Sequence, residues 1–419
     1  MEGHECLSGH GPDSADCGNF RDRKLLVRSA ILKACGSVVS VVTYDLPDDM
    51  LKRRGSRLMV PGYSSKEPIF WGSGIVMECE PNANGTHYLT VLTTAMIFKR
   101  TNNLQPDDVV VDVGLPDGEE LEARVICYDF HYNLVALKVE SNRAMPIANM
   151  KLVDDVLQLD PEELLPHSFQ LRPHSDRVKL VPGELVIGLG RHYRGDLTNA
   201  VGFYSPEPTG EECMELYGAY FCNHMLEDGG PLINRMGQVI GIKFHTRGHP
   251  YTTFLPTNII LKWWSHYKKF GDVRRPWLGI NVFNLHEAML NLLLKFPNIT
   301  TGVIVKEVSE DSPAHLAGLQ CNDVIVQCDG SPVRSILEFF ERTWDKVGES
   351  VELGIVRAGM SHPLKRVVQV QEASPDKYYS WLLPEWFTKE PRVYEDEDED
   401  EGEGEEEGED GEEKGDMEE

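Results

Sequence analysis

Short apolar and alternating runs dominate the chain between residues 25 and 140. Turn-forming stretches such as Pro47-Asp48-Asp49 and Pro116-Asp117-Gly118 separate them. Runs of about four to eight residues rich in Val, Ile and Leu predict β-strands, and many short strands in series predict a barrel or sandwich. The runs lie at 37–42, 74–77, 88–92, 109–113 and 134–139.

A second series of apolar runs follows a polar connector. These runs lie at 184–189, 200–204, 217–221 and 239–242. Residues 255–270 then have the pattern of a helix, with Pro256 near its start, Ile260 and Trp263 on apolar faces and Gly271 as a stop signal. The pattern predicts two β units closed by a helix.

A third unit extends from Pro276 to about Val370, with strands predicted at 302–305 and 323–328 and an amphipathic helix predicted at 285–296. The polar, acidic and glycine-rich N-terminus is predicted to be disordered. These boundaries predict five segments: a disordered arm at 1–22, a two-barrel domain at 23–272, a third domain at 273–372, a linker at 373–394 and a tail at 395–419.

Most of the negative charge lies at the C-terminus. Residues 395–419 hold 18 Asp and Glu and one Lys, which account for −17 of the formal net charge of −27. The rest of the chain has no broad basic region, so no nucleic-acid partner is expected. The tail has too few apolar groups to fold, and we expect it to be disordered and to promote solubility. A sharper hypothesis is that it binds basic proteins.

Cysteine usage and the N-terminus bear on the compartment. The nine cysteines are scattered without a Cys-x-x-Cys pair, which favours free thiols in a reducing compartment. The N-terminus lacks the basic start and apolar core of a signal peptide, and no run approaches the ~18 apolar residues of a membrane span. We expect a cytoplasmic or nuclear protein without a membrane partner. Cys222 and His224 would share one face of a strand, but no third ligand accompanies them, so neither a metal nor another cofactor is expected.

Four segments of the first two β units carry the motifs of one protease family. Residues 71–76 read Trp-Gly-Ser-Gly-Ile-Val, residues 91–96 end in Met96, residues 133–138 read Asn-Leu-Val-Ala-Leu-Lys, and residues 226–232 read Leu-Glu-Asp-Gly-Gly-Pro-Leu before a strand. In this order and spacing they resemble the HtrA (Do-like, or Deg) serine proteases. The resemblance implies a mostly β fold: a chymotrypsin-like double β-barrel followed by a PDZ domain, here with a disordered acidic C-terminal tail.

The resemblance also implies that every member of the catalytic triad is substituted. Met96 stands at the position of the histidine, Asn133 at that of the aspartate and Asp228 at that of the serine. A thioether cannot act as a general base, a neutral amide cannot stabilise an imidazolium, and a carboxylate cannot form the serine acyl-enzyme. Leu226 stands where the family has a glycine whose amide helps to bind the oxyanion. No catalytic residue is therefore expected.

The third unit resembles the PDZ domain of the same family. Trp277-Leu278-Gly279-Ile280 is similar to the carboxylate-binding loop, and the matching segments that follow lie at 302–305, 312–319, 322–325, 329–330 and 351–357. The resemblance implies that the amides of Leu278, Gly279 and Ile280 bind the terminal carboxylate of a peptide that adds a strand to the sheet edge. Peptides or protein C-termini are thus the expected partners.

Three functional hypotheses follow. The first is an inactive HtrA homologue that binds peptides or unfolded chains as an adaptor or chaperone-like scaffold. The second is an active Do-like endopeptidase with relocated catalytic residues, for which Ser73, Ser205 and Ser312 are the nearby serines. The third is a regulatory pseudo-subunit that joins active homologues. The chain would then form a homo- or hetero-oligomer.

Overall fold

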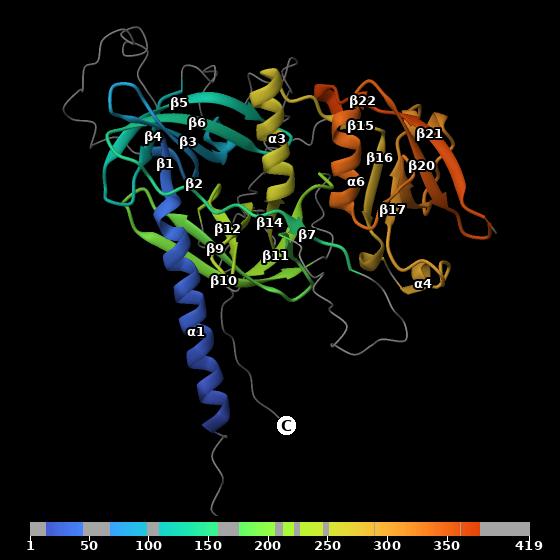
Figure 1. Cartoon of the computed structure of the whole chain (residues 1–419), viewed down its shortest axis with the longest axis horizontal. Helices are drawn as coiled ribbons and strands as arrows, with labels where there is room; N and C mark the ends of the chain where they lie inside the picture. Colours follow the sequence, from blue (N-terminus) through green and yellow to red (C-terminus); the bar gives the residue numbers. More distant parts are fainter. Residues whose placement is uncertain are drawn as a thin grey trace, which may run out of the picture.

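The computed structural model describes residues 14–44, 68–98, 109–157, 176–205, 213–221, 227–245, 251–288, 290–360 and 362–377. Two β-barrels lie beside a smaller α/β domain, and a long N-terminal helix extends from the barrels (Figure 1). Within the described residues, no helix is long and apolar enough to cross a membrane. The expectations for Leu226, Cys222, His224 and the acidic tail concern residues outside the described part of the chain.

The first barrel is a closed antiparallel sheet in the order β1-β2-β3-β6-β5-β4. Alternate side chains point inward, as the period of two in the apolar runs predicted. Val39, Val41, Val76, Leu89 and Val91 fill its core. Its strands are β1 (Val38–Tyr44), β2 (Pro68–Pro81), β3 (His87–Thr94), β4 (Val111–Gly114), β5 (Glu120–Asp129) and β6 (Leu134–Ser141).

The second barrel is also closed, in the order β10-β11-β14-β13-β12-β9. Its strands are β9 (Leu185–Arg191), β10 (Leu197–Ser205), β11 (Tyr217–Phe221), β12 (Pro231–Asn234), β13 (Val239–His245) and β14 (Tyr251–Pro256). A short parallel pair, β7 (Val153–Asp154) and β8 (Val178–Lys179), lies outside both barrels. The two barrels confirm the predicted double-barrel fold.

The predicted closing helix is confirmed. Helix α3 (Thr257–Phe270) follows Pro256 and ends at Gly271, whose φ of 72° is left-handed and whose amide donates to Tyr267 O. Glycine adopts this conformation without the steric cost that a Cβ would add. Trp263 and Ile260 of this helix are buried, so α3 packs its apolar side against the rest of the molecule.

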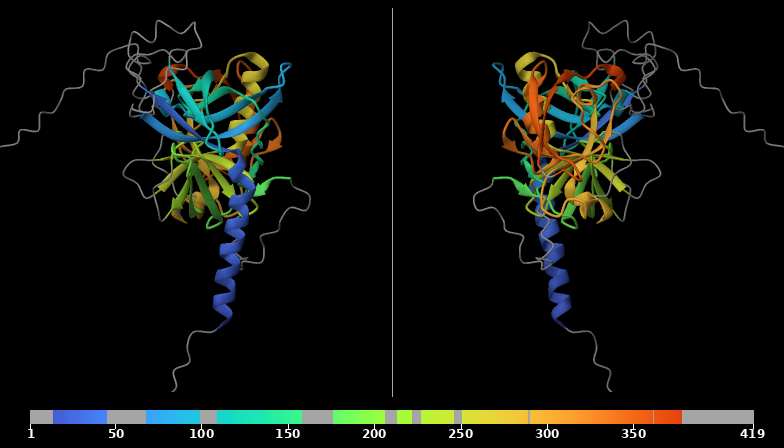
Figure 2. Two further views of the ribbon diagram at one scale, coloured as in Figure 1. Left: turned by 90° about the vertical axis from the view of Figure 1, so that its left-hand side faces the viewer. Right: turned by 90° about the vertical axis from the view of Figure 1, so that its right-hand side faces the viewer.

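The N-terminal arm was predicted to be disordered over 1–22, and this is wrong from residue 14 onward. Helix α1 (Ser14–Ala34) is 21 residues long and extends away from the barrels in Figures 1 and 2. Its C-terminal part is anchored because Ala30 and Ala34 are buried in the main core. Leu25, Leu26 and Leu32 remain exposed on the same helix. A polar composition predicted disorder, but tertiary packing of the last turns stabilises the helix.

The third domain contains a sheet in the order β16-β17-β18-β20-β21, with β19 paired to β18. Its strands are β16 (Ile280–Asn284), β17 (Val303–Val308), β18 (Val324–Cys328), β19 (Ser331–Pro332), β20 (Ser350–Val356) and β21 (Leu364–Gln369). Strands β15 (Pro276–Trp277) and β22 (Gln371–Glu372) form a separate pair. The domain also contains α5 (Pro313–Leu316) and α6 (Ile336–Thr343), and the single-turn helix η6 (Trp344–Lys346) follows α6.

The helix predicted at 285–296 is replaced by two short turns. A single-turn helix η5 (Leu285–Glu287) is followed by α4 (Leu290–Leu293), with Ala288 extended between them. Leu285 and Phe296 are buried together in a small apolar cluster with strand residues of the sheet. The amphipathic pattern therefore reflects packing of separate anchor residues on the domain core, not one continuous helix.

Candidate functional site

Asn133, one of the predicted triad positions, lies beside the C-terminal end of β3. This residue lies in the turn between β5 and β6, is 1% exposed and has a left-handed φ of 54°. Asparagine adopts this conformation more readily than most residues with a side chain. Thr94 Oγ1 donates a 2.8 Å hydrogen bond to Asn133 Oδ1, and Ala95 N donates to Asn133 O at 3.1 Å. The amide is thus fixed against the last residue of β3.

Met96 lies two residues beyond the same strand end, on the short helix η3 (Ala95–Phe98). Its side chain is half-buried between the buried residues Ala95 and Ile97, and its amide donates to Thr94 Oγ1 at 3.2 Å. A thioether sulfur is only a weak hydrogen-bond acceptor and cannot take a proton at neutral pH. This position supplies no general base.

The loop that carries Asp228 reaches this strand end from the second barrel. Gly229 has a φ of 80°, and a Cβ atom there would lie 2.9 Å from Thr94 N. A glycine is therefore required for the loop to approach β3 so closely. The structure thus brings the backbone segments that carry Met96, Asn133 and Asp228 together around Thr94, although they come from two different barrels.

A buried lysine lies beneath this loop. Lys243 of β13 is 1% exposed, and its Nζ donates to the backbone oxygen of Glu227. Burial lowers the pKa of Lys243 to about 8, against the opposing influence of the Asp228 and Glu227 carboxylates. Thr198 Oγ1 in turn donates to Glu227 Oε2. The amino group of Lys243 therefore binds the loop backbone, close to the carboxylates of Glu227 and Asp228. The sequence motifs did not predict this arrangement.

Two of the three serines considered as alternative nucleophiles are buried and accept hydrogen bonds from backbone amides. Ser73 is 0% exposed, and its Oγ accepts a 2.8 Å hydrogen bond from Arg191 N across the two barrels. Ser312 is also 0% exposed, and its Oγ accepts from His315 N at 3.2 Å as the N-cap of α5. Ser205 is half-buried at the end of β10. None of these contacts places a base beside a serine hydroxyl.

The predicted carboxylate-binding loop lies between β15 and β16. Ala314 N donates to Leu278 O at 3.0 Å, and Ser309 N donates to Gly279 O at 2.8 Å. The carbonyl and the following amide point in opposite directions in a trans peptide. The amides of Gly279 and Ile280 therefore point away from α5, toward the free side of the loop.

The conformation of this loop depends on Gly279. Its φ is 78°, and a Cβ atom would lie only 2.1 Å from the Cβ of Ser312. At the other end of β16, Asn284 Oδ1 accepts a 2.8 Å hydrogen bond from Ile336 N at the start of α6. This bond ties β16 to α6.

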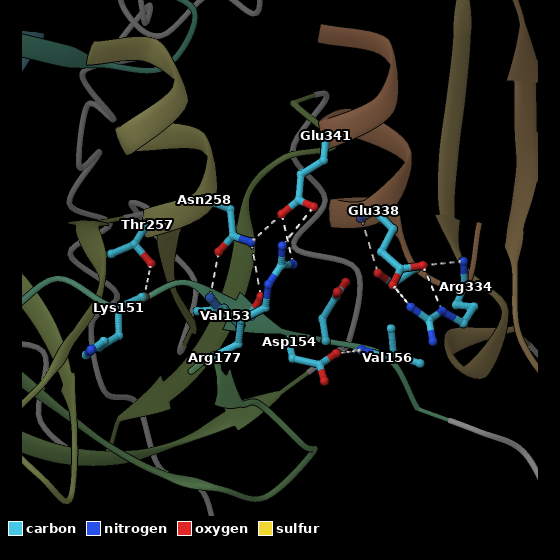
Figure 3. A network of polar contacts seen from close by, with 12 residues as sticks. Lys151, Val153, Asp154, Val156, Arg177, Thr257, Asn258, Arg334, Glu338 and Glu341 are labelled. Carbon is cyan, nitrogen blue, oxygen red and sulfur yellow. Dashed lines mark hydrogen bonds and ion pairs between the residues drawn. The ribbon is translucent and has the colours of Figure 1, made fainter. Parts of the chain in front are cut away.

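Polar contacts fasten α6 to the barrel domain (Figure 3). Glu341 Oε1 accepts a hydrogen bond from Asn258 Nδ2 at 3.2 Å, and Oε2 accepts one from Arg177 Nη2 at 3.1 Å within an ion pair. Asn258 also bonds both backbone groups of Val153, accepting from its N at 2.7 Å and donating to its O at 3.0 Å. Helix α3, strand β7 and α6 are thereby joined through one asparagine.

A buried ion pair fixes the segment that links the two domains. Arg275 and Asp129 are 5% and 7% exposed, and Arg275 Nη2 lies 2.5 Å from Asp129 Oδ2. Trp263 Nε1 also donates to Asp129 Oδ2, at 3.1 Å. Because breaking a buried pair leaves an uncompensated charge, these contacts hold the linker rigidly against the first barrel.

Comparisons with known proteins agree with this architecture. The PDZ domain family model matches residues 276–375. The putative protease Do-like 14 of Arabidopsis thaliana is 27% identical over 321 residues, covering 73% of this chain and 65% of that protein. The serine protease Do-like HtrA of Bacillus subtilis is 24% identical over 311 residues, covering 69% and 61%. The chain therefore spans less than two thirds of the length of these relatives.

Among solved structures, the HtrA-type protease AlgW with tripeptide has a TM-score of 0.51 at 19% identity, covering 84% of this chain and 99% of that one. At this identity the likeness establishes the fold. The relatives named above extend along about 70% of the chain and the PDZ match covers its last domain. The chain is therefore similar to the HtrA (Do-like) serine proteases, and its double barrel is followed by a PDZ domain.

Proposed function

We propose that this chain is a catalytically inactive HtrA homologue that binds peptides or unfolded protein segments through its PDZ domain and acts as an adaptor or chaperone-like scaffold. The observation that carries the proposal is the composition of the strand end around Thr94. The backbone segments that meet there carry Met96, Asn133 and Asp228, the positions that the resemblance assigns to the base, the orienting carboxylate and the hydroxyl. None of the three can perform the step that serine proteolysis assigns to its position.

The buried contacts of the loop support the same proposal. A serine nucleophile needs a neighbouring base that removes its proton. The group beneath the Asp228 loop is Lys243, whose Nζ already donates to Glu227 O. The relatives are named as proteases, so the proposal assigns to this chain a loss of chemistry on a retained scaffold.

Binding through the PDZ domain is supported by the carboxylate-binding loop. The carbonyls of Leu278 and Gly279 are held by Ala314 N and Ser309 N, which leaves the amides of Gly279 and Ile280 directed away from α5. Backbone amides that converge in this way bind a terminal carboxylate, while the adjacent strand edge pairs with the peptide. We propose peptides and protein C-termini as ligands and a cytoplasmic or nuclear location, and basic proteins as partners of the acidic tail.

Two measurements on the purified full-length chain test the proposal. The first is hydrolysis of an unfolded protein such as reduced casein, together with labelling by a fluorophosphonate probe; we expect neither. Cleavage that persists in the purified chain would show that a catalyst exists and would contradict the inactive assignment.

The second measurement is binding to an array of peptides with free C-termini that differ in the last residue, each paired with a copy that ends in an amide. We expect the free carboxylates to bind and the amides to bind at least about tenfold more weakly, because the amide removes a charge-assisted hydrogen bond. Equal binding of both members of each pair would contradict the assigned loop.

A further inference from the structure

Three buried side chains with metal-binding atoms meet at the junction of the two barrels. His131 lies in the turn between β5 and β6 of the first barrel, and Cys213 and Glu215 precede β11 of the second barrel. They are 9%, 2% and 5% exposed. The sequence separation of 82 residues between His131 and Cys213 explains why no motif indicated a metal site.

The three atoms form a nearly regular triangle. Cys213 Sγ lies 3.7 Å from His131 Nε2 and 3.3 Å from Glu215 Oε2, and His131 Nε2 lies 3.7 Å from Glu215 Oε2. In a tetrahedral zinc site, bonds of about 2.3 Å to sulfur and about 2.0–2.2 Å to nitrogen and oxygen separate neighbouring ligand atoms by about 3.3–3.6 Å. The side chains therefore already have the spacing of three zinc ligands.

The Cys213 thiol donates to Glu215 Oε2 at 3.3 Å, and His131 Nε2 lies 3.7 Å from the same oxygen. A carboxylate that is almost completely buried needs a close positive charge or several donors. A cation between the three atoms would supply that charge. A role for Cys213 as a nucleophile is disfavoured by its exposure of 2%, which leaves no access for a substrate.

The surroundings would orient the carboxylate ligand. Tyr132 Oη donates to Glu215 Oε1 at 3.1 Å, which leaves Oε2 directed toward Cys213 and His131. Hydrogen bonds of this kind from outside the ligand set hold metal ligands in place. Sulfur, imidazole and one carboxylate together favour zinc over calcium or magnesium, which bind through oxygen.

We propose that His131 Nε2, Cys213 Sγ and Glu215 Oε2 bind one zinc ion that joins the two barrels next to the PDZ domain. The site departs from the expectation that the chain needs no metal, and it is independent of the proposed peptide binding. Three protein ligands leave the fourth tetrahedral position to a water molecule. Because both barrels contribute ligands, part of the free energy of zinc binding would stabilise their association.

The test uses the full-length chain purified without chelators. We expect about one zinc per chain by elemental analysis, and thiolate-to-cobalt charge-transfer absorption after replacement of zinc by Co²⁺. Cys213→Ser should abolish the charge-transfer band, and Glu215→Gln should weaken zinc binding in a chelator competition by at least about tenfold. The matched control is Cys328→Ser, which changes a cysteine that is also buried but lies in the PDZ sheet.

Thermal stability provides a second measurement, which does not require a folded variant at Cys213 or Glu215. A chelator should lower the melting temperature of the unmodified chain and of Cys328→Ser, because an ion that binds only the folded state stabilises it. An unmodified chain that binds neither zinc nor Co²⁺ in stoichiometric amounts would overturn the proposal. So would a Cys213→Ser variant that retains the cobalt charge-transfer band.

Discussion

Trp344 of the PDZ domain stacks on Tyr132 of the first barrel, with ring centroids 5.8 Å apart and ring planes inclined by 19°. Both rings are almost completely buried, at 1% and 0% exposure. Tyr132 is the residue immediately before Asn133, so the PDZ domain packs directly on the turn that carries one predicted triad position. The two domains therefore share a core instead of being joined by a loose linker.

Removing this ring should weaken both domains together. We expect Trp344→Ala to lower the free energy of unfolding by about 3–5 kcal/mol, the usual cost of truncating a buried aromatic side chain. In calorimetry, a single transition of the unmodified chain should separate into two when the domains no longer stabilise one another. The control is Phe270→Ala, since Phe270 is 54% exposed. An equal effect of both changes would contradict the shared core.

Under the proposed function, a serine introduced at position 228 should not by itself become a reactive nucleophile. We expect Asp228→Ser to remain unlabelled by a fluorophosphonate probe, because Met96 and Asn133 still provide neither a base nor an orienting carboxylate. Labelling is measured beside Ser73→Ala, which removes a buried serine bonded to Arg191 N. Strong labelling at position 228 in the single variant would show that another group already acts as the base.

Lys243 predicts a dependence of stability on pH. Its folded pKa is lowered to about 8 from 10.5, because burial disfavours the charged form. The unfolded chain then binds more protons than the folded chain between these values, so the free energy of unfolding rises with pH in this window. The loss of stability caused by burying the charged lysine is fully present below about pH 8 and disappears above about pH 10.5. For a shift of this size it amounts to about 3 kcal/mol.

Denaturant titrations of the unmodified chain and of Lys243→Met between pH 7 and 10.5 measure this effect. As the pH rises and Lys243 loses its charge, the unfolding free energy of the unmodified chain should rise relative to that of Lys243→Met. Lys269→Met, at an exposed position on α3, serves as the control. A constant difference between Lys243→Met and the unmodified chain across the range would contradict the lowered pKa of Lys243.

The sequence predicted the strands and α3 well because their signals are local. Short runs rich in Val and Leu marked β1 and β3, while Pro256 and Gly271 marked the ends of α3. The segment 285–296 was predicted incorrectly, because periodicity does not distinguish one helix from separate anchors such as Leu285 and Phe296. Composition likewise missed the start of α1, which is stabilised by packing distant in sequence.

Only those residues of the candidate site that belong to sequence motifs could be predicted. The motifs led to Met96, Asn133 and Asp228, and the structure brings their backbone segments together. Lys243 and the Asn258–Glu341 contact left no such trace, because they depend on which strands and helices become neighbours. A lysine after the apolar run at 239–242 indicates a buried charge only once its neighbours in the fold are known.

The role proposed for the loop at residues 278–280 can be tested with two glycines of the same domain. Gly279 and Gly330 have similar left-handed φ values of 78° and 72°, so alanine pays a similar conformational cost of roughly 1–2 kcal/mol at either position. Only at Gly279 would the new Cβ collide with another residue, Ser312; around Gly330 nothing lies within 4 Å. Gly279→Ala must therefore shift the loop, and we expect it to weaken binding of C-terminal peptides by at least about tenfold.

The control variant, Gly330→Ala, should bind these peptides as the unmodified chain does. Fluorescence anisotropy with a labelled peptide chosen from the array measures both, and an equal loss in the two variants would show that backbone strain, not the loop amides, controls binding.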